Sequence, residues 1–246
     1  MKINKTIKIL VFITLFALVI ISCNKNEINP DNLSNGKSTA VFNSDLTYGT
    51  VVDRDGNEYK TIVIGTQTWM AENLRTTMYN DGSDIPLVTD NTEWSVLTTP
   101  AYCNYNNSTN LDTIGTYGRL YNGYAVSKDI CPTGWHVPNG DDWAILMQSL
   151  TSEEFAGGKM KEAGTTHWYD PNYYANNESG FTALPAGWRV GGFFDYIGIN
   201  TMFWSSEVDD FYDDVLFSKH LSYAWGECME SSADLKQGNS VRCVKD

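Results

Sequence analysis

Five carboxylates lie within eight residues late in the sequence, and they form its densest group of candidate metal ligands. Calcium takes six to eight oxygen ligands and prefers such clusters. We expect no cofactor: the cluster is interpreted as a solvated acidic loop between strands, with a calcium site as the alternative. The candidate ligands are Glu207, Asp209, Asp210, Asp213 and Asp214.

Aromatic residues in polar and glycine-containing stretches are the second group that points to binding chemistry. Exposed rings on loops stack on sugar faces or anchor protein partners. The candidate ligand-binding residues are Tyr173, Tyr174, Trp188, Tyr212 and Trp225. Four other tryptophans lie on predicted strands or beside a predicted helix, so we assign them to packing. They are Trp69, Trp135, Trp143 and Trp204.

The sequence lacks the local signatures of common catalytic sites. Its three histidines form no H-x-x-x-H or H-x-H pattern, and no C-x-x-C occurs for a zinc site. G-x-S-x-G, Walker A and G-x-G-x-x-G motifs are also missing. A Ser, a His and an Asp that lie far apart in the sequence, without a local signature, do not predict a catalytic triad. No catalytic residue is predicted, and we expect a protein that is not an enzyme.

The composition restricts the partners. The chain has 246 residues, 13% aromatic residues and a formal net charge of −13. Such aromatic content is too high for a disordered chain, and the length allows one or two domains. Nucleic-acid binding draws its affinity from clustered Lys and Arg, so this acidic chain is not expected to bind nucleic acid.

The first residues have the pattern of a secretory signal, in which basic residues precede an apolar run from Ile9 to Ile21. The run is shorter than the roughly 20 residues of a membrane-spanning helix. Ile20-Ile21-Ser22-Cys23 resembles the bacterial lipobox, which implies cleavage before Cys23 and lipidation of its thiol. An ordinary cleaved signal is the alternative. We expect a signal peptide at 1–22 and a lipid-anchored protein of the bacterial cell envelope, at the outer membrane and exposed on the surface.

Residues 23–47 are rich in Asn, Ser and Lys and have no apolar period, so they read as a flexible tether before a domain at 48–246. Two β-branched and aromatic runs flank the turn at 53–57, which predicts a hairpin. Apolar residues at helical spacing after Asn139 predict an amphipathic helix, and a second helix is expected at 152–163. Short apolar pieces follow from residue 181 onward. This order predicts an α+β domain whose first and last strands pair in one sheet.

Eight sequence blocks, in order from about residue 50 to the end, resemble the Fibrobacter succinogenes major paralogous domain family. They include Ile64-Gly65 with Trp69-Met70-Ala71-Glu72-Asn73-Leu74, Tyr117-Gly118-Arg119-Leu120-Tyr121-Asn122, Cys131-Pro132-Thr133-Gly134-Trp135-His136-Val137-Pro138, Ala156-Gly157-Gly158-Lys159-Met160-Lys161-Glu162, Phe203-Trp204-Ser205-Ser206 and Gly238-Asn239-Ser240-Val241-Arg242-Cys243-Val244. The resemblance implies a C-type-lectin-like fold, in which two helices flank a small, mostly antiparallel sheet with long loops. It implies no activity, because that fold hosts sugar binding, protein binding and an oxidase.

Four cysteines besides Cys23 permit three pairings in an exported chain. The resemblance implies a disulfide between Cys131 and Cys243, together with a second one between Cys103 and Cys228. Free reactive thiols, as in the formylglycine-generating enzymes, are the alternative.

Three functional hypotheses follow. The first is a binding or adhesion module that presents a lectin-like loop face to an extracellular glycan or protein. The second is a thiol- or metal-dependent oxidase related in fold to the formylglycine-generating enzymes. The third is a structural envelope protein that binds a neighbouring lipoprotein.

Overall fold

The computed structural model describes residues 36–151, 153–209, 212 and 214–246. The strands are β1 (Gly49–Val52), β2 (Glu58–Ile64), β3 (Gln67–Met70), β4 (Tyr102–Cys103), β5 (Leu120–Tyr121), β6 (Trp135–His136), β7 (Ala186–Val190), β8 (Phe193–Ile197), β9 (Asn200–Val208), β10 (Val215–Ser222), β11 (Met229–Asp234) and β12 (Val244–Lys245). The helices are α1 (Asn91–Ser95), α2 (Leu111–Tyr117), α3 (Gly123–Val126), α4 (Gly140–Ser149) and α5 (Glu153–Met160), with a 3-10 turn η1 (Tyr105–Asn107). None of the helices in the described ranges is long and apolar enough to span a membrane.

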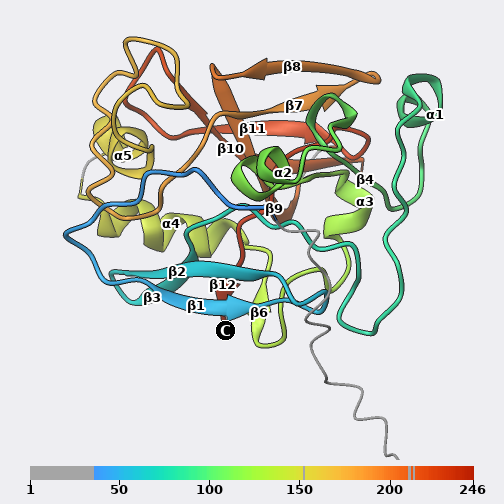
Figure 1. Ribbon diagram of the computed structural model, residues 1–246, viewed down its shortest axis with the longest axis horizontal. Helices are drawn as coiled ribbons and strands as arrows, with labels where there is room; N and C mark the ends of the chain where they lie inside the picture. The colour runs from blue at the N-terminus through green and yellow to red at the C-terminus, as the bar shows by residue number, and fades with distance from the viewer. Residues whose placement is uncertain (1–35, 152, 210–211, 213) are drawn as a thin grey trace, which may run out of the picture.

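The first sheet has the strand order β1-β2-β3-β12-β6 and lies at the lower edge of Figure 1. Its first hairpin forms where the turn at 53–57 predicts it, with Val52 opposite Glu58. The last strand joins the first ones, because Val244 pairs with Trp69 of β3. The prediction that both ends of the domain share one sheet is therefore confirmed.

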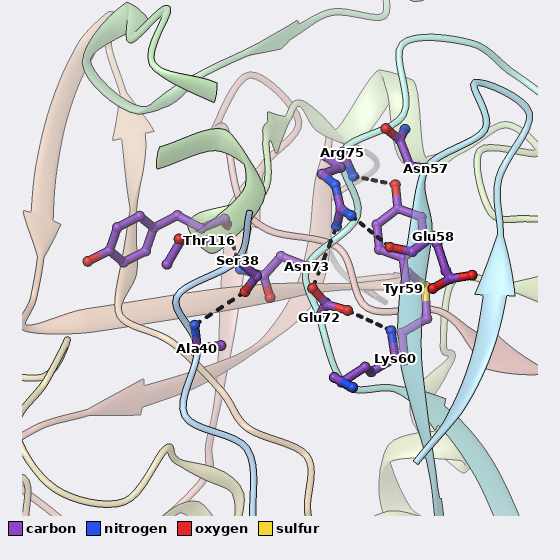
Figure 2. A network of polar contacts seen from close by, with 12 residues as sticks. Ser38, Ala40, Asn57, Glu58, Tyr59, Lys60, Glu72, Asn73, Arg75 and Thr116 are labelled. Atoms are coloured by element: carbon purple, nitrogen blue, oxygen red, sulfur yellow. Dashed lines mark hydrogen bonds and ion pairs between the residues drawn. The ribbon is translucent and has the colours of Figure 1, made fainter. Parts of the chain in front are cut away.

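A polar network connects the segment after β3 to β2 (Figure 2). Oε2 of Glu72 accepts from the backbone N–H of Lys60 at 2.6 Å, and Nη2 of Arg75 donates to the carbonyl of Glu58 at 2.7 Å. The backbone N–H of Arg75 donates to the hydroxyl of Tyr59 at 2.9 Å. These bonds satisfy buried polar groups where the chain leaves the sheet.

The second sheet has the strand order β11-β10-β9-β7-β8, and β7 and β8 lie at the upper edge of Figure 1. β7 and β8 form a hairpin whose turn is Gly191-Gly192, with φ of 57° and 90°. Glycine adopts such angles without a steric cost, which suits a two-residue turn. Trp188 and Tyr196 therefore lie on strands rather than on loops.

α4 packs between the two sheets. Asn139 caps this helix and forms a capping box with Asp142. Its buried Trp143 contacts Trp69 of β3, Phe181 and Phe203 of β9, with ring centroids 4.8, 6.3 and 6.3 Å away. Such aromatic pairs contribute about 0.5–1.5 kcal/mol each beyond their buried area. Trp69, Trp135, Trp143 and Trp204 are all buried, which confirms their assignment to packing.

The N-terminal segment, defined here as residues 37–47, contacts the domain. The backbone N–H of Lys37 donates to Asp112, that of Val41 to Glu162, and Nδ2 of Asn43 donates to the carbonyl of Asn177. Phe42 and Leu46 pack against the core around Trp143. The predicted tether up to residue 47 is therefore corrected for these residues, because their backbone groups and two apolar side chains find partners on the domain.

Cys131 and Cys243 form the disulfide that the family resemblance implies. It joins the segment before α4 to the residue before β12. The second expected pairing, Cys103–Cys228, is wrong, because both thiols are free. Cys103 lies among Val88, Trp94 and Leu120, whereas Cys228 packs against the separate core around Trp143.

The α+β class is thus confirmed, while the expectation of one small sheet with two flanking helices is corrected. The described residues form two five-stranded sheets and one pair, β4 with β5, which are mostly antiparallel. Within the described ranges, three short helices, α1 to α3, also precede the two expected ones. α5 ends at Met160 rather than 163, because Lys161 forms a bridge with Ala183.

We expect loss of the Cys131–Cys243 bond to destabilise the domain strongly, because the bond closes a loop that spans most of the fold. Cys131→Ala/Cys243→Ala should reduce the free energy of unfolding by roughly 2–5 kcal/mol, as measured by urea unfolding. Cys228→Ala is the control and should change it much less. Peptide mapping without reduction should recover the peptide that contains Cys131 linked to the peptide that contains Cys243. Recovery of a 103–228 link instead would contradict the arrangement.

Candidate functional site

Two of the aromatic residues singled out in the sequence come together on the second sheet. Trp188 of β7 and Trp225, in the loop after β10, both lie edge-on to His220 of β10, with centroid distances of 5.6 and 5.5 Å. Tyr196 of β8 lies against Trp188 at 4.5 Å. All four side chains are at least partly exposed. They form a continuous row of rings at the surface.

Tyr173 and Tyr174 belong to a neighbouring loop. They are 52% and 62% exposed, and the Tyr174 ring also packs against Phe155 of α5, with ring centroids 4.7 Å apart. The backbone N–H of Tyr173 donates to the carbonyl of Tyr223, so the loop lies beside the one that carries Trp225. We call the surface formed by Tyr173, Tyr174, Trp188, Tyr196, His220 and Trp225 the aromatic face.

Lys161 joins the two loops of the aromatic face from below. Its side chain is fully buried, and Nζ donates to the carbonyls of Tyr173, Ser222 and Trp225 at 3.0, 2.7 and 2.8 Å. Nζ also lies 5.5 Å from the ring centre of the buried Trp168. Burial lowers the pKa of Lys161 to about 8. The hydrogen-bond acceptors of this ammonium are thus three backbone carbonyls rather than a carboxylate.

Tyr196 and His220 are the two members of this face that the sequence did not predict as binding residues. A single histidine on a strand has no local signature. Burial lowers the pKa of the His220 imidazole. Nε2 of His220 and Nε1 of Trp225 are buried and have no hydrogen-bond partner among the described residues. A neutral imidazole between two indoles keeps the row apolar, which suits contact with C–H groups.

Tyr212, the fifth predicted binding residue, does not belong to this face. It is 65% exposed and lies before β10, whereas Trp225 follows the other end of that strand. Eight residues of strand separate the two ends by roughly 25 Å. Tyr212 can therefore not share one small ligand with Trp225.

The predicted calcium ligands diverge where they are described. A Cβ on Gly140 would lie 1.9 Å from Oε2 of Glu207, so this carboxylate lies against the start of α4. Asp209 accepts from the hydroxyl of Ser232. Asp210 and Asp213 lie outside the described residues. Within the described part of the chain, no three His, Cys, Asp or Glu side chains are grouped to hold a metal ion. The calcium site stays a prediction.

The two free thiols are poorly arranged for the metal–thiol chemistry of the oxidase hypothesis. Burial raises the pKa of both Cys103 and Cys228 to about 12, which opposes thiolate formation. They also belong to different hydrophobic clusters. A two-thiol copper site would need both thiolates close together.

A second polar group of note is the Thr39–His167–Glu162 array. Nδ1 of His167 lies 2.7 Å from Oε2 of the fully buried Glu162, and Nε2 lies 2.9 Å from the hydroxyl of Thr39. The Thr39 hydroxyl also lies 3.0 Å from that of Thr116. When the carboxylate of Glu162 accepts a hydrogen bond from Nδ1–H of His167, Nε2 carries no proton. Nε2 can then accept a hydrogen bond from the hydroxyl of Thr39. The order of groups is that of a hydrolase triad, and it also fastens the N-terminal segment.

Comparison with known families and proteins gives one match. The Fibrobacter succinogenes major domain matches residues 62–245, which contain both sheets apart from β1 and the start of β2. Neither the curated proteins nor the solved structures include a match. Because the match extends over about three quarters of the sequence, this chain belongs to the Fibrobacter succinogenes major domain family.

Proposed function

We propose that this protein is a binding module whose aromatic face stacks on an extracellular glycan. The observation that carries the proposal is the continuous, partly exposed row Tyr196–Trp188–His220–Trp225. Pyranose rings expose C–H groups on one face, and these pack against aromatic rings. Tyr173 and Tyr174 supply two further exposed rings and hydroxyl groups on the neighbouring loop.

The charge of the protein narrows the class of glycan. With a formal net charge of −13, the chain repels polyanions such as acidic polysaccharides. The rings of the aromatic face carry no charge, and its imidazole has a lowered pKa. The preferred ligand is therefore a neutral polysaccharide.

The proposed setting is the cell envelope, with the domain held by lipid on Cys23. This part of the proposal rests on the Ile20-Ile21-Ser22-Cys23 motif, and Cys23 lies outside the described residues. A C-type-lectin-like fold is part of the same proposal. It is supported by the Cys131–Cys243 bond and by the pairing of the last strand with β3.

Replacing the two indoles should remove glycan binding without unfolding the domain. In affinity electrophoresis through laminarin, xylan or galactomannan, we expect the wild-type domain to be retarded by at least one of the three. Trp188→Ala and Trp225→Ala should each weaken the interaction roughly tenfold, since a stacked tryptophan is a typical binding hot spot.

Tyr212→Ala is the matched control, because it removes an exposed aromatic ring at the far end of β10. It should bind as the wild type does, and thermal unfolding should verify that all variants are folded. Polygalacturonate should cause no retardation. Equal loss of binding in Tyr212→Ala, or binding to none of the neutral polysaccharides, would contradict the proposal.

The Thr39–His167–Glu162 array favours a second candidate function, an esterase. Thr39 is exposed, and its hydroxyl oxygen would attack the ester carbonyl while Nε2 of His167 takes the hydroxyl proton. That proton would pass to the departing alcohol, and water would release the acid from Thr39 in the reverse sequence. The sum is ester plus water giving acid plus alcohol.

Hydrolysis of p-nitrophenyl acetate tests this candidate. If the array is catalytic, Thr39→Ala and His167→Gln should reduce the rate at least about a hundredfold, while Thr166→Ala, an exposed neighbour, should leave it unchanged. A fluorophosphonate should label Thr39. If the wild type shows neither turnover nor labelling, the array only fastens the N-terminal segment.

A further inference from the structure

The aromatic face is composed of rings from a sheet and from two loops that have little regular structure. Trp188, Tyr196 and His220 lie on strands, which fix their positions. Tyr173 and Tyr174 lie in the loop 168–176, and Trp225 lies in the loop 223–228. Some interaction must therefore hold these two loops in register with the sheet.

Backbone bonds tie the two loops both to α5 and to the second sheet. At α5, the N–H of Gly158 donates to the carbonyl of Gly226, and the N–H of Asn176 donates to the carbonyl of Gly158. The N–H of Tyr169 donates to the carbonyl of Gly198, and the N–H of Tyr223 donates to that of Ile199. One further bond joins the loops, from the N–H of Tyr173 to the carbonyl of Tyr223. Nζ of Lys161 adds three more bonds. It donates to the carbonyl of Tyr173 in the first loop, to that of Trp225 in the second loop and to that of Ser222 at the end of β10.

The backbone and the side chain of Lys161 are both held in place by neighbouring residues. Its backbone N–H donates to the carbonyl of Gly157 in α5, and the residue forms a bridge with Ala183. The Trp168 ring covers the ammonium from one side, and its own Nε1 donates to the carbonyl of Ala183. Glu227 is the charged group that acts on the ammonium from the second loop. The side chain thus starts from a fixed backbone and ends under both loops.

We propose that Lys161 is the positioning residue of the aromatic face, and that it holds the loops 168–176 and 223–228 in the arrangement that places Tyr173 and Tyr174 beside Trp225. The function of this face rests on the glycan-binding proposal, but the positioning does not. A buried carbonyl without a donor destabilises the structure, and three such carbonyls lose their donor together when the ammonium is removed. The carbonyls can recover hydrogen bonds from water only if the loops separate.

Lys161→Met is the sharpest variant, because methionine keeps an unbranched stem but has no donor. In the full domain, amide hydrogen exchange at pH 7 should accelerate roughly tenfold or more in peptides from 168–176 and 222–228. Peptides from β3 should exchange as in the wild type. Lys159→Met is the matched control, since its Nζ binds only Glu178, at 3.5 Å and with more exposure.

Lys161→Gln keeps an N–H donor on a shorter, neutral stem, so it should show a smaller acceleration in the same two loops. It also keeps the proposal testable if Lys161→Met does not fold. Unchanged exchange in both loops, or equal acceleration throughout the domain including β3, would overturn the positioning role.

Retardation by the same neutral polysaccharides separates this proposal from the one on which it rests. Local acceleration together with loss of retardation in Lys161→Met supports both. Local acceleration in a protein whose wild type binds none of the polysaccharides supports the positioning role and overturns glycan binding. Retained binding by Lys161→Met despite opened loops would overturn the claim that the arrangement matters for the face.

Discussion

The buried guanidinium of Arg242 must find oxygen acceptors, and the rest of the domain is arranged so that it does. Its side chain is 1% exposed, between the rings of Phe181 and Phe203. It donates to Oδ1 of Asn73 and to the carbonyls of Met70, Phe181 and Thr182. Removing a charge from water costs several kcal/mol unless such bonds replace its hydration. One side chain near the C-terminus therefore determines where two distant segments, 70–73 and 181–182, lie.

The segment that carries Arg242 also joins the two sheets. The carbonyl of Cys243 accepts from Met70 in the first sheet, and the carbonyl of Ser240 accepts from Trp204 in the second. The Cys131–Cys243 bond then links the same segment to the chain before α4. Because so many contacts converge here, the arrangement of the sheets and the position of α4 depend on one another.

Buried cations that bind carbonyls recur in this fold and explain how long irregular segments are fixed. Arg189 donates to the carbonyls of Val88, Thr89 and Asp90 and lies over the ring of Trp94. Lys161 does the same for the two loops of the aromatic face. Loops have many backbone carbonyls without strand or helix partners, and one cation satisfies several of them. Buried cations that donate to backbone carbonyls thus stabilise both the core and the candidate binding surface.

The sequence by itself determined the α+β class, the first hairpin, the Asn139 cap of α4 and the family, because these depend on local turns, on apolar spacing and on ordered motifs. Tertiary structure alone decided that Trp188 and Trp225 meet at His220 while Tyr212 lies apart, and that Cys103 and Cys228 stay unpaired. It also decided the contacts of residues 37–47, whose polar composition gives no apolar period. These features are set by which strands become neighbours and by where buried cations find acceptors, and neither is encoded in local spacing.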